Sequence, residues 1–79
     1  MPDATTIAAK ATRTTIRRAI EAAERGASTS LTASAWMSVE AALGFALESL
    51  DKNGSRRATA YVTGNALYVG PRKRTKPTD

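Results

Sequence analysis

Residues 58–69 read Ala-Thr-Ala-Tyr-Val-Thr-Gly-Asn-Ala-Leu-Tyr-Val, and this stretch decides the fold of the C-terminal third. Side chains alternate on both sides of Gly64-Asn65, as expected for two antiparallel strands joined by a two-residue turn. Glycine at the first turn position suits a type II′ turn, which places Tyr61 opposite Tyr68. The aliphatic face of this hairpin would hold Ala60, Val62, Leu67 and Val69. Two strands alone are marginal in water, so we expect this face to pack on a helix.

Helical periodicity precedes the hairpin. Apolar residues recur at helical spacing from Ile16 onward, and Gly26 is a suitable C-terminal stop. A second helix is expected to begin near the N-cap residues Thr32 or Ser34 and to stop at Asn53-Gly54. Its packed stripe is predicted to be Trp36, Val39, Leu43, Leu47 and Leu50.

Two segments have weaker signals. Residues 6–12 are rich in alanine, which favours continuing the first helix toward the N-terminus. The same residues could run extended, with Ile7, Ala9 and Ala11 on one side. Residues 26–33, a run of small and hydroxyl side chains, are interpreted as a linker.

The sequence therefore predicts one small α+β domain over residues 1–71, in which two amphipathic helices are followed by a C-terminal two-stranded antiparallel β-hairpin. Residues 72–79 are predicted to form a basic flexible tail. A chain of 79 residues without cysteine has a thin core and no disulfide to strengthen it. Association into a homodimer is the remaining way to stabilise such a domain, so we expect one.

The composition excludes several kinds of chemistry. The chain has no Cys and no His, so thiol nucleophiles, imidazole bases and ordinary zinc sites are not available. Its few neighbouring carboxylates lie in no evident apolar pocket, and no phosphate loop or nucleophile motif is present. The sequence predicts a protein that is not an enzyme and uses no cofactor and no metal. With neither a signal peptide nor a long apolar run, we expect a cytoplasmic protein without a membrane partner.

Positive charge is concentrated toward the C-terminus. The formal net charge is +5, and residues 52–79 hold seven basic residues against Asp79 alone, whereas residues 26–51 hold three acidic residues and no base. Such a distribution attracts polyanions, although lysine and arginine also keep small proteins soluble.

Extending the hairpin register places Arg57 opposite Arg72, on the same face as the two tyrosines. Nucleic-acid binders combine cations for phosphates with flat aromatic faces for unpaired bases. The leading hypothesis is a regulatory or accessory nucleic-acid-binding module. Its predicted contact residues are Arg56, Arg57, Tyr61, Tyr68, Arg72, Lys73 and Arg74. Cross-strand tyrosines also stabilise hairpins without binding anything, and this alternative stays open.

A second hypothesis is an inhibitor encoded by a phage or mobile element, comparable to anti-CRISPR proteins, that docks on a nucleic-acid-handling protein complex. Phe45 lies outside the predicted stripe of the second helix, near Ala41 and Ser38. These three residues would form a flat protein interface, unless Phe45 packs against the first helix or the strands.

If residues 6–12 are extended, the order of elements is similar to that of ribbon–helix–helix repressors. Lys10, Thr12 and Thr14 would then be the outward side chains of the DNA-binding strand. The resemblance covers less than two thirds of the chain and leaves the hairpin as an addition.

Overall fold

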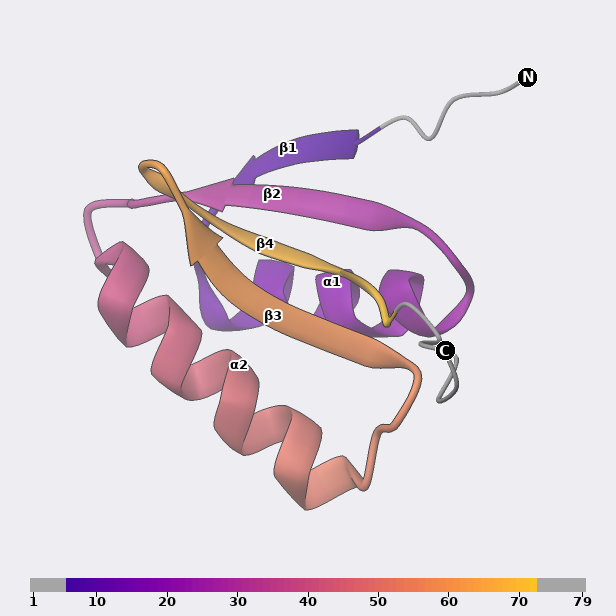
Figure 1. The fold of residues 1–79 in the computed structure, drawn as a ribbon. Helices are drawn as coiled ribbons and strands as arrows, with labels where there is room; N and C mark the ends of the chain where they lie inside the picture. The colour runs from indigo at the N-terminus through magenta and orange to yellow at the C-terminus, as the bar shows by residue number, and fades with distance from the viewer. Residues whose placement is uncertain (1–5, 73–79) are drawn as a thin grey trace.

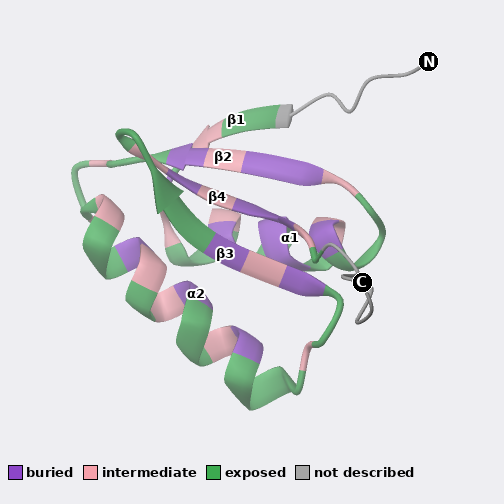
Figure 2. Cartoon of the chain, in the orientation of Figure 1, coloured by how far each residue is buried: buried purple, intermediate pink, exposed green. Residues whose placement is uncertain are grey.

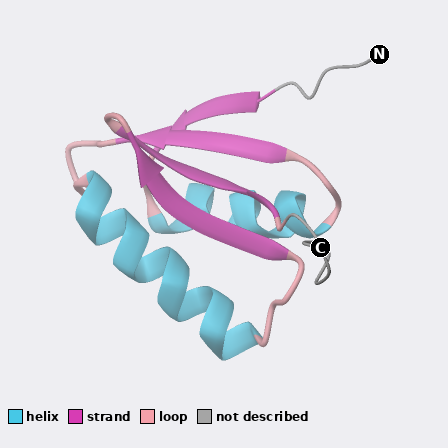
Figure 3. Cartoon of the chain, viewed as in Figure 1, coloured by secondary structure: helices cyan, strands magenta, loops and turns pink. Residues whose placement is uncertain are grey.

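The computed structural model describes residues 6–72. Within them the elements follow the order β1 (Thr6–Lys10), α1 (Arg13–Glu24), β2 (Ser28–Thr32), α2 (Val39–Asn53), β3 (Ala58–Thr63) and β4 (Ala66–Pro71). The strands form one sheet in the order β1-β2-β4-β3, in which β1 and β2 are parallel and the other neighbours antiparallel. Both helices lie on one face of this sheet and contact each other, which makes a two-layer α+β fold (Figures 1 and 3).

This arrangement corrects the predicted fold. The chain is α+β, but the expectation of two helices followed by a two-stranded hairpin is wrong, because the hairpin is only half of a mixed four-stranded sheet. The hairpin joins the sheet through β4, which pairs with β2. The two additional strands come from the segments with the weakest sequence signals.

The first additional strand is β1, where the preference for helix was wrong. Ile7 pairs with Thr29 and Ala9 with Leu31, so β1 gains a ladder of backbone hydrogen bonds that outweighs the helix propensity of alanine. Thr12 then ends the extended run as the N-cap of α1, where its side chain and that of Thr15 form a reciprocal capping box.

This placement also excludes a ribbon of the ribbon–helix–helix type. β1 pairs with β2 of its own chain, Thr12 caps α1 and Thr14 lies inside that helix.

The second additional strand is β2, which was expected to be a linker. Its sequence, Ser-Thr-Ser-Leu-Thr, has little apolar content, but Thr29 and Leu31 point toward the helices and are buried. Threonine is β-branched and tolerates a strand well, and the sheet on both sides satisfies the backbone of β2. Leu31 is 0% exposed and belongs to the hydrophobic core.

Helix α2 begins later and packs on a different line than predicted. Its N-cap is Ser38, and Gly54, with φ of 63°, ends it in the left-handed conformation expected from Asn53-Gly54. The residues of α2 that face the sheet most closely are Ala42, Ala46 and Leu50. Small side chains let the helix approach the sheet closely, so the larger side chains lie along its flanks.

The predicted stripe of α2 is therefore only partly correct. Val39 and Leu43 pack against the core as flanking residues and Leu50 is buried. Leu47 is 48% exposed, and Trp36, which precedes the helix, is 83% exposed.

The predicted register of the hairpin is confirmed. Tyr61 pairs with Tyr68 and Ala60 with Val69 across the turn, and Gly64 has φ of 64°, as a type II′ turn requires. Ala60, Leu67 and Val69 are buried beneath the helices, whereas Val62 on the outermost strand is 40% exposed. Among the strands, Figure 2 shows the buried residues mainly in β2, β4 and the start of β3, and both helices also have buried residues.

Candidate functional site

The face of the sheet that carries no helix is the main candidate surface, which we call the open sheet face. Strand alternation and register give it these residues: Ala8 and Lys10 from β1, Ser28, Ser30 and Thr32 from β2, Thr59, Tyr61 and Thr63 from β3, and Ala66, Tyr68 and Gly70 from β4. Most of these side chains are small or carry a hydroxyl group. The two tyrosines are the only aromatic side chains among them.

Tyr61 and Tyr68 lie side by side at the centre of the hairpin half of this face. Their ring centroids are 5.0 Å apart and the ring planes are tilted by 35°. This spacing lies in the range of favourable aromatic pairs. Tyr61 is 49% exposed, so one aromatic ring is offered to solvent while its neighbour supports it.

Tyr68 is held in place by two neighbours from different strands. Its hydroxyl group lies 2.8 Å from the hydroxyl oxygen of Ser28 in a hydrogen bond. Its ring lies over Gly70, where a Cβ atom would come within 2.5 Å of Cζ of the ring. The glycine therefore makes room for the ring, which covers both Gly70 and Ser28 and buries them.

A Gly70→Ala substitution tests this support. The added methyl group must displace the Tyr68 ring, which breaks the hydrogen bond to Ser28 and forces a less favourable rotamer. We expect a loss of about 1–3 kcal/mol in the free energy of unfolding, measured by urea denaturation. Gly44→Ala is the matched control, because nothing lies within 4 Å of a Cβ there and the change should stabilise α2 slightly. Equal stabilities of the two variants would contradict the assigned position of the ring.

The charges at the open sheet face all have one sign. Lys10 lies at one end of the face, and Arg57 and Arg72 lie at the other, where the Arg72 amide donates to the carbonyl oxygen of Arg57 at 2.7 Å. All three residues are exposed. The acidic residues of the described chain are instead on the helices, Glu21 and Glu24 on α1 and Glu40, Glu48 and Asp51 on α2. The open sheet face is thus cationic, whereas the helical layer has mixed charge.

Of the remaining predicted nucleic-acid contacts, Arg56 does not lie beside the tyrosines. Arg56 lies in the connection between α2 and β3, where it lines hollows with Asp51 and Glu24. Arg57 borders the second of these hollows as well, so it lies at the margin of the face. Lys73 and Arg74 lie outside the described residues.

The predicted protein interface has a different environment. Ser38 is occupied as the N-cap of α2, because its hydroxyl oxygen accepts from the Ala41 amide at 3.1 Å. Ala41 is exposed, but Phe45 packs partly against the core. The Arg17 guanidinium lies 5.9 Å from the centre of the Phe45 ring, so Phe45 meets α1, as one of the sequence alternatives expected.

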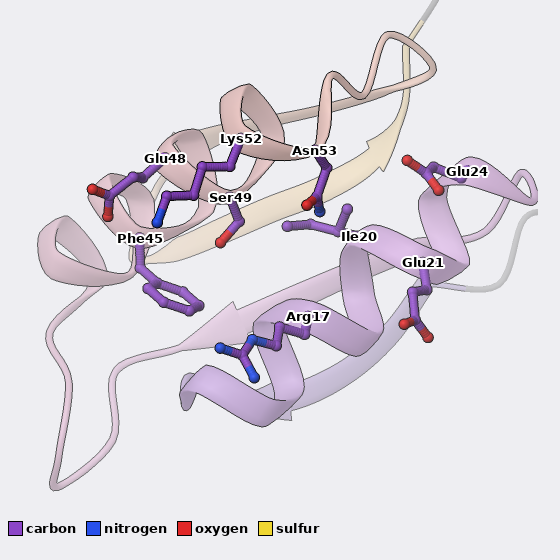
Figure 4. Close-up of a pocket in the computed structure, with 9 residues that line it drawn as sticks. All are labelled: Arg17, Ile20, Glu21, Glu24, Phe45, Glu48, Ser49, Lys52 and Asn53. Atoms are coloured by element: carbon purple, nitrogen blue, oxygen red, sulfur yellow. The ribbon is translucent and has the colours of Figure 1, made fainter.

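Phe45 lines a groove of about 370 Å³ between α1 and α2 (Figure 4). Its other lining residues are Arg17, Ile20, Glu21, Glu24, Glu48, Ser49, Lys52 and Asn53. Both acidic side chains (Glu21, Glu24 and Glu48) and basic side chains (Arg17 and Lys52) line the groove, so it presents no single charge to a ligand. We regard the groove as weaker than the open sheet face as a candidate site.

Sequence reasoning missed the part of the open sheet face contributed by β1 and β2. Ser28 and Ser30 entered no prediction, and Thr32 was considered only as a candidate N-cap of the second helix, because their segment was interpreted as a linker. The alternation of Thr29 and Leu31 with these three residues was the available signal for a half-buried strand.

Comparison of the chain with protein-family models, with curated proteins and with solved structures found no match. Within residues 6–72, no group of three or more His, Cys, Asp or Glu side chains could hold a metal ion. No helix in the same part of the chain has the length and apolar character needed to cross a membrane.

Proposed function

We propose that the protein binds single-stranded nucleic acid on the open sheet face, as a regulatory or accessory module. The observation that carries this proposal is the exposed Tyr61 ring beside the half-buried Tyr68 ring, on a sheet face whose charged residues are all basic. Unpaired bases stack on such rings, whereas paired bases in a duplex keep their faces buried against one another. The surrounding hydroxyl groups can donate and accept hydrogen bonds at the base edges.

Lys10, Arg57 and Arg72 supply the phosphate contacts in this proposal. They lie at the two ends of the face, so a strand that crosses the tyrosines can reach cations on either side. Contacts of this kind favour binding without reading the sequence. Lys73 and Arg74 follow Arg72 directly in the chain, and their contribution stays a prediction.

The proposal is tested by fluorescence-anisotropy titration of labelled single strands and of the matching duplex over a series of salt concentrations. We expect tighter binding of the single strand than of the duplex. A plot of the logarithm of the binding constant against the logarithm of the salt concentration should be linear, with a negative slope of about 0.7 per phosphate contact. Absence of binding near physiological salt, or a preference for duplex, would contradict the proposal.

Removal of one cation tests whether a particular arginine contacts phosphate. Arg57→Ala should weaken binding of all sequences similarly and lower the magnitude of the salt slope by about 0.7, because one phosphate contact is lost. Arg18→Ala is the matched control, since Arg18 is also exposed but lies on α1, on the helical side of the domain. If both variants change the slope equally, binding reflects overall charge and not this face.

A further inference from the structure

The free edge of the sheet next to the tyrosines is unprotected. β3 is an outermost strand, and its six residues, Ala58–Thr63, include no charged side chain and no proline (Figure 1). Natural proteins usually protect such edges with lysine, proline or a bulge, because the unpaired backbone groups recruit another strand. β1, the strand at the opposite edge, ends on Lys10.

The backbone groups that β3 offers can be assigned. Thr63 and Ala66 flank the two-residue turn and exchange hydrogen bonds, so every second residue before Thr63 faces β4. The bond between Arg57 and Arg72 agrees with this assignment. The N–H and C=O groups of Ala58, Ala60 and Val62 therefore point outward, away from the sheet.

The side chains at this edge form a projection and a hollow. Val62 is 40% exposed on the helix-facing side of the strand. A hollow of about 380 Å³ lies at the other end of β3. Its apolar wall is formed by Ala58, Ala60, Leu47 and Leu50, and its charged lining residues are Asp51, Arg56 and Arg72. Leu47 is 48% exposed there.

We infer that β3 pairs antiparallel with β3 of a second copy of this chain, with the two-fold axis at Ala60. This register sets Ala58 opposite Val62 of the second copy, so all outward backbone groups of the strand are paired. It also inserts each Val62 into the hollow beside the other copy's Ala58 and covers Leu47. An axis at Tyr61 would instead leave the groups of Ala58 unpaired. The interface is self-complementary, as a two-fold dimer requires.

Dimerisation would join the two open sheet faces into one. Tyr61 of the two copies would be diagonal neighbours across the axis, about 7–8 Å apart. A band of four tyrosines would then cross the dimer, with arginines from both copies at its margins. A role of this tyrosine band in binding rests on the proposed function. The pairing of the two β3 strands does not, and it is tested without nucleic acid.

The first test is sedimentation equilibrium of the full chain over a range of concentrations. We expect a dimer that Val62→Lys weakens about tenfold or more, because an ammonium group cannot be buried against Ala58 and Leu47 without losing its water. Ile7→Lys is the matched control, since Ile7 is a 53% exposed apolar residue on the opposite edge strand. A monomeric wild-type chain would overturn the inference, as would a dimer that Val62→Lys leaves intact while circular dichroism shows it folded.

The second test measures the proximity of the two β3 strands, which the register determines. It applies even if Val62→Lys fails to fold. The chain has no cysteine, so Thr59→Cys carries a single spin label. Labels on the two copies of residue 59 would be diagonal neighbours, so we expect strong dipolar broadening of the electron paramagnetic resonance spectrum. Ser30→Cys is the control, because residue 30 lies on the same face but two strands farther from the axis. Its label should show much less dipolar broadening. Equal broadening at both positions, or none at residue 59, would overturn the pairing.

Discussion

Replacing Tyr61 by alanine should weaken the binding of single-stranded nucleic acid by about 5- to 150-fold. The estimate follows from the loss of one base–aromatic stack, about 1–3 kcal/mol, with each 1.4 kcal/mol equal to a factor of ten. Tyr61 is the more exposed ring of the pair, so its loss removes the stacking surface and leaves the phosphate-binding cations in place. The affinity should fall while the salt slope stays unchanged, as measured by anisotropy titration at several salt concentrations.

Two controls separate stacking from general effects. Tyr61→Phe keeps the ring and should bind within about twofold of the wild type, since a π-face and not a hydroxyl group carries the stack. Trp36→Ala removes an aromatic ring that is 83% exposed but lies in the connection between β2 and α2, outside the sheet. If Tyr61→Ala and Trp36→Ala lower the affinity equally, the open sheet face is not the binding surface.

A second large effect is expected in the core. Ile16 of α1 is 0% exposed, and Ile16→Ala should reduce the free energy of unfolding by about 2–5 kcal/mol through lost burial and the cavity that remains. Alanine has the higher helix propensity, so the loss reports packing between α1 and the sheet and not a weaker helix. A domain of this size has a free energy of unfolding of about 4–12 kcal/mol in total, so the variant should lose a large share of its stability.

The matched control for this prediction is Ile7→Ala. The same atoms are removed, but Ile7 is 53% exposed on β1, and the loss should stay below about 1 kcal/mol. Both variants are measured by urea denaturation at one protein concentration, because association with a second copy would otherwise change the apparent stability. A loss at Ile16 no larger than that at Ile7 would contradict the assigned core.

Part of the candidate site could be predicted from the sequence, and part could not. The neighbouring tyrosines and the pair Arg57 and Arg72 followed from the turn alone, since a two-residue loop fixes which residues are opposite each other. That the tyrosine side of the hairpin belongs to a wider open face did not follow. It depends on β2, which supplies Ser28 to the hydroxyl group of Tyr68 over a separation of 40 residues.

The sequence by itself determined the features that local interactions control. Glycine at the first turn position set the hairpin register, and Asn53-Gly54 set the end of α2, because a residue with positive φ must stand at each of these points. Alternation of side chains around the turn then fixed which face of the hairpin is aliphatic.

Only the tertiary structure decided what β1, β2 and the packed face of α2 become. Parallel strands such as β1 and β2 are not joined by a tight turn that would indicate their pairing. Their alanine and serine residues do not favour a strand locally, and the few threonines do not outweigh them. Their backbone hydrogen bonds form only once α1 has brought the two segments together. The close approach of α2 through Ala42 and Ala46 is likewise a property of the assembled layers, because a small side chain becomes a packing site only when a sheet lies against it.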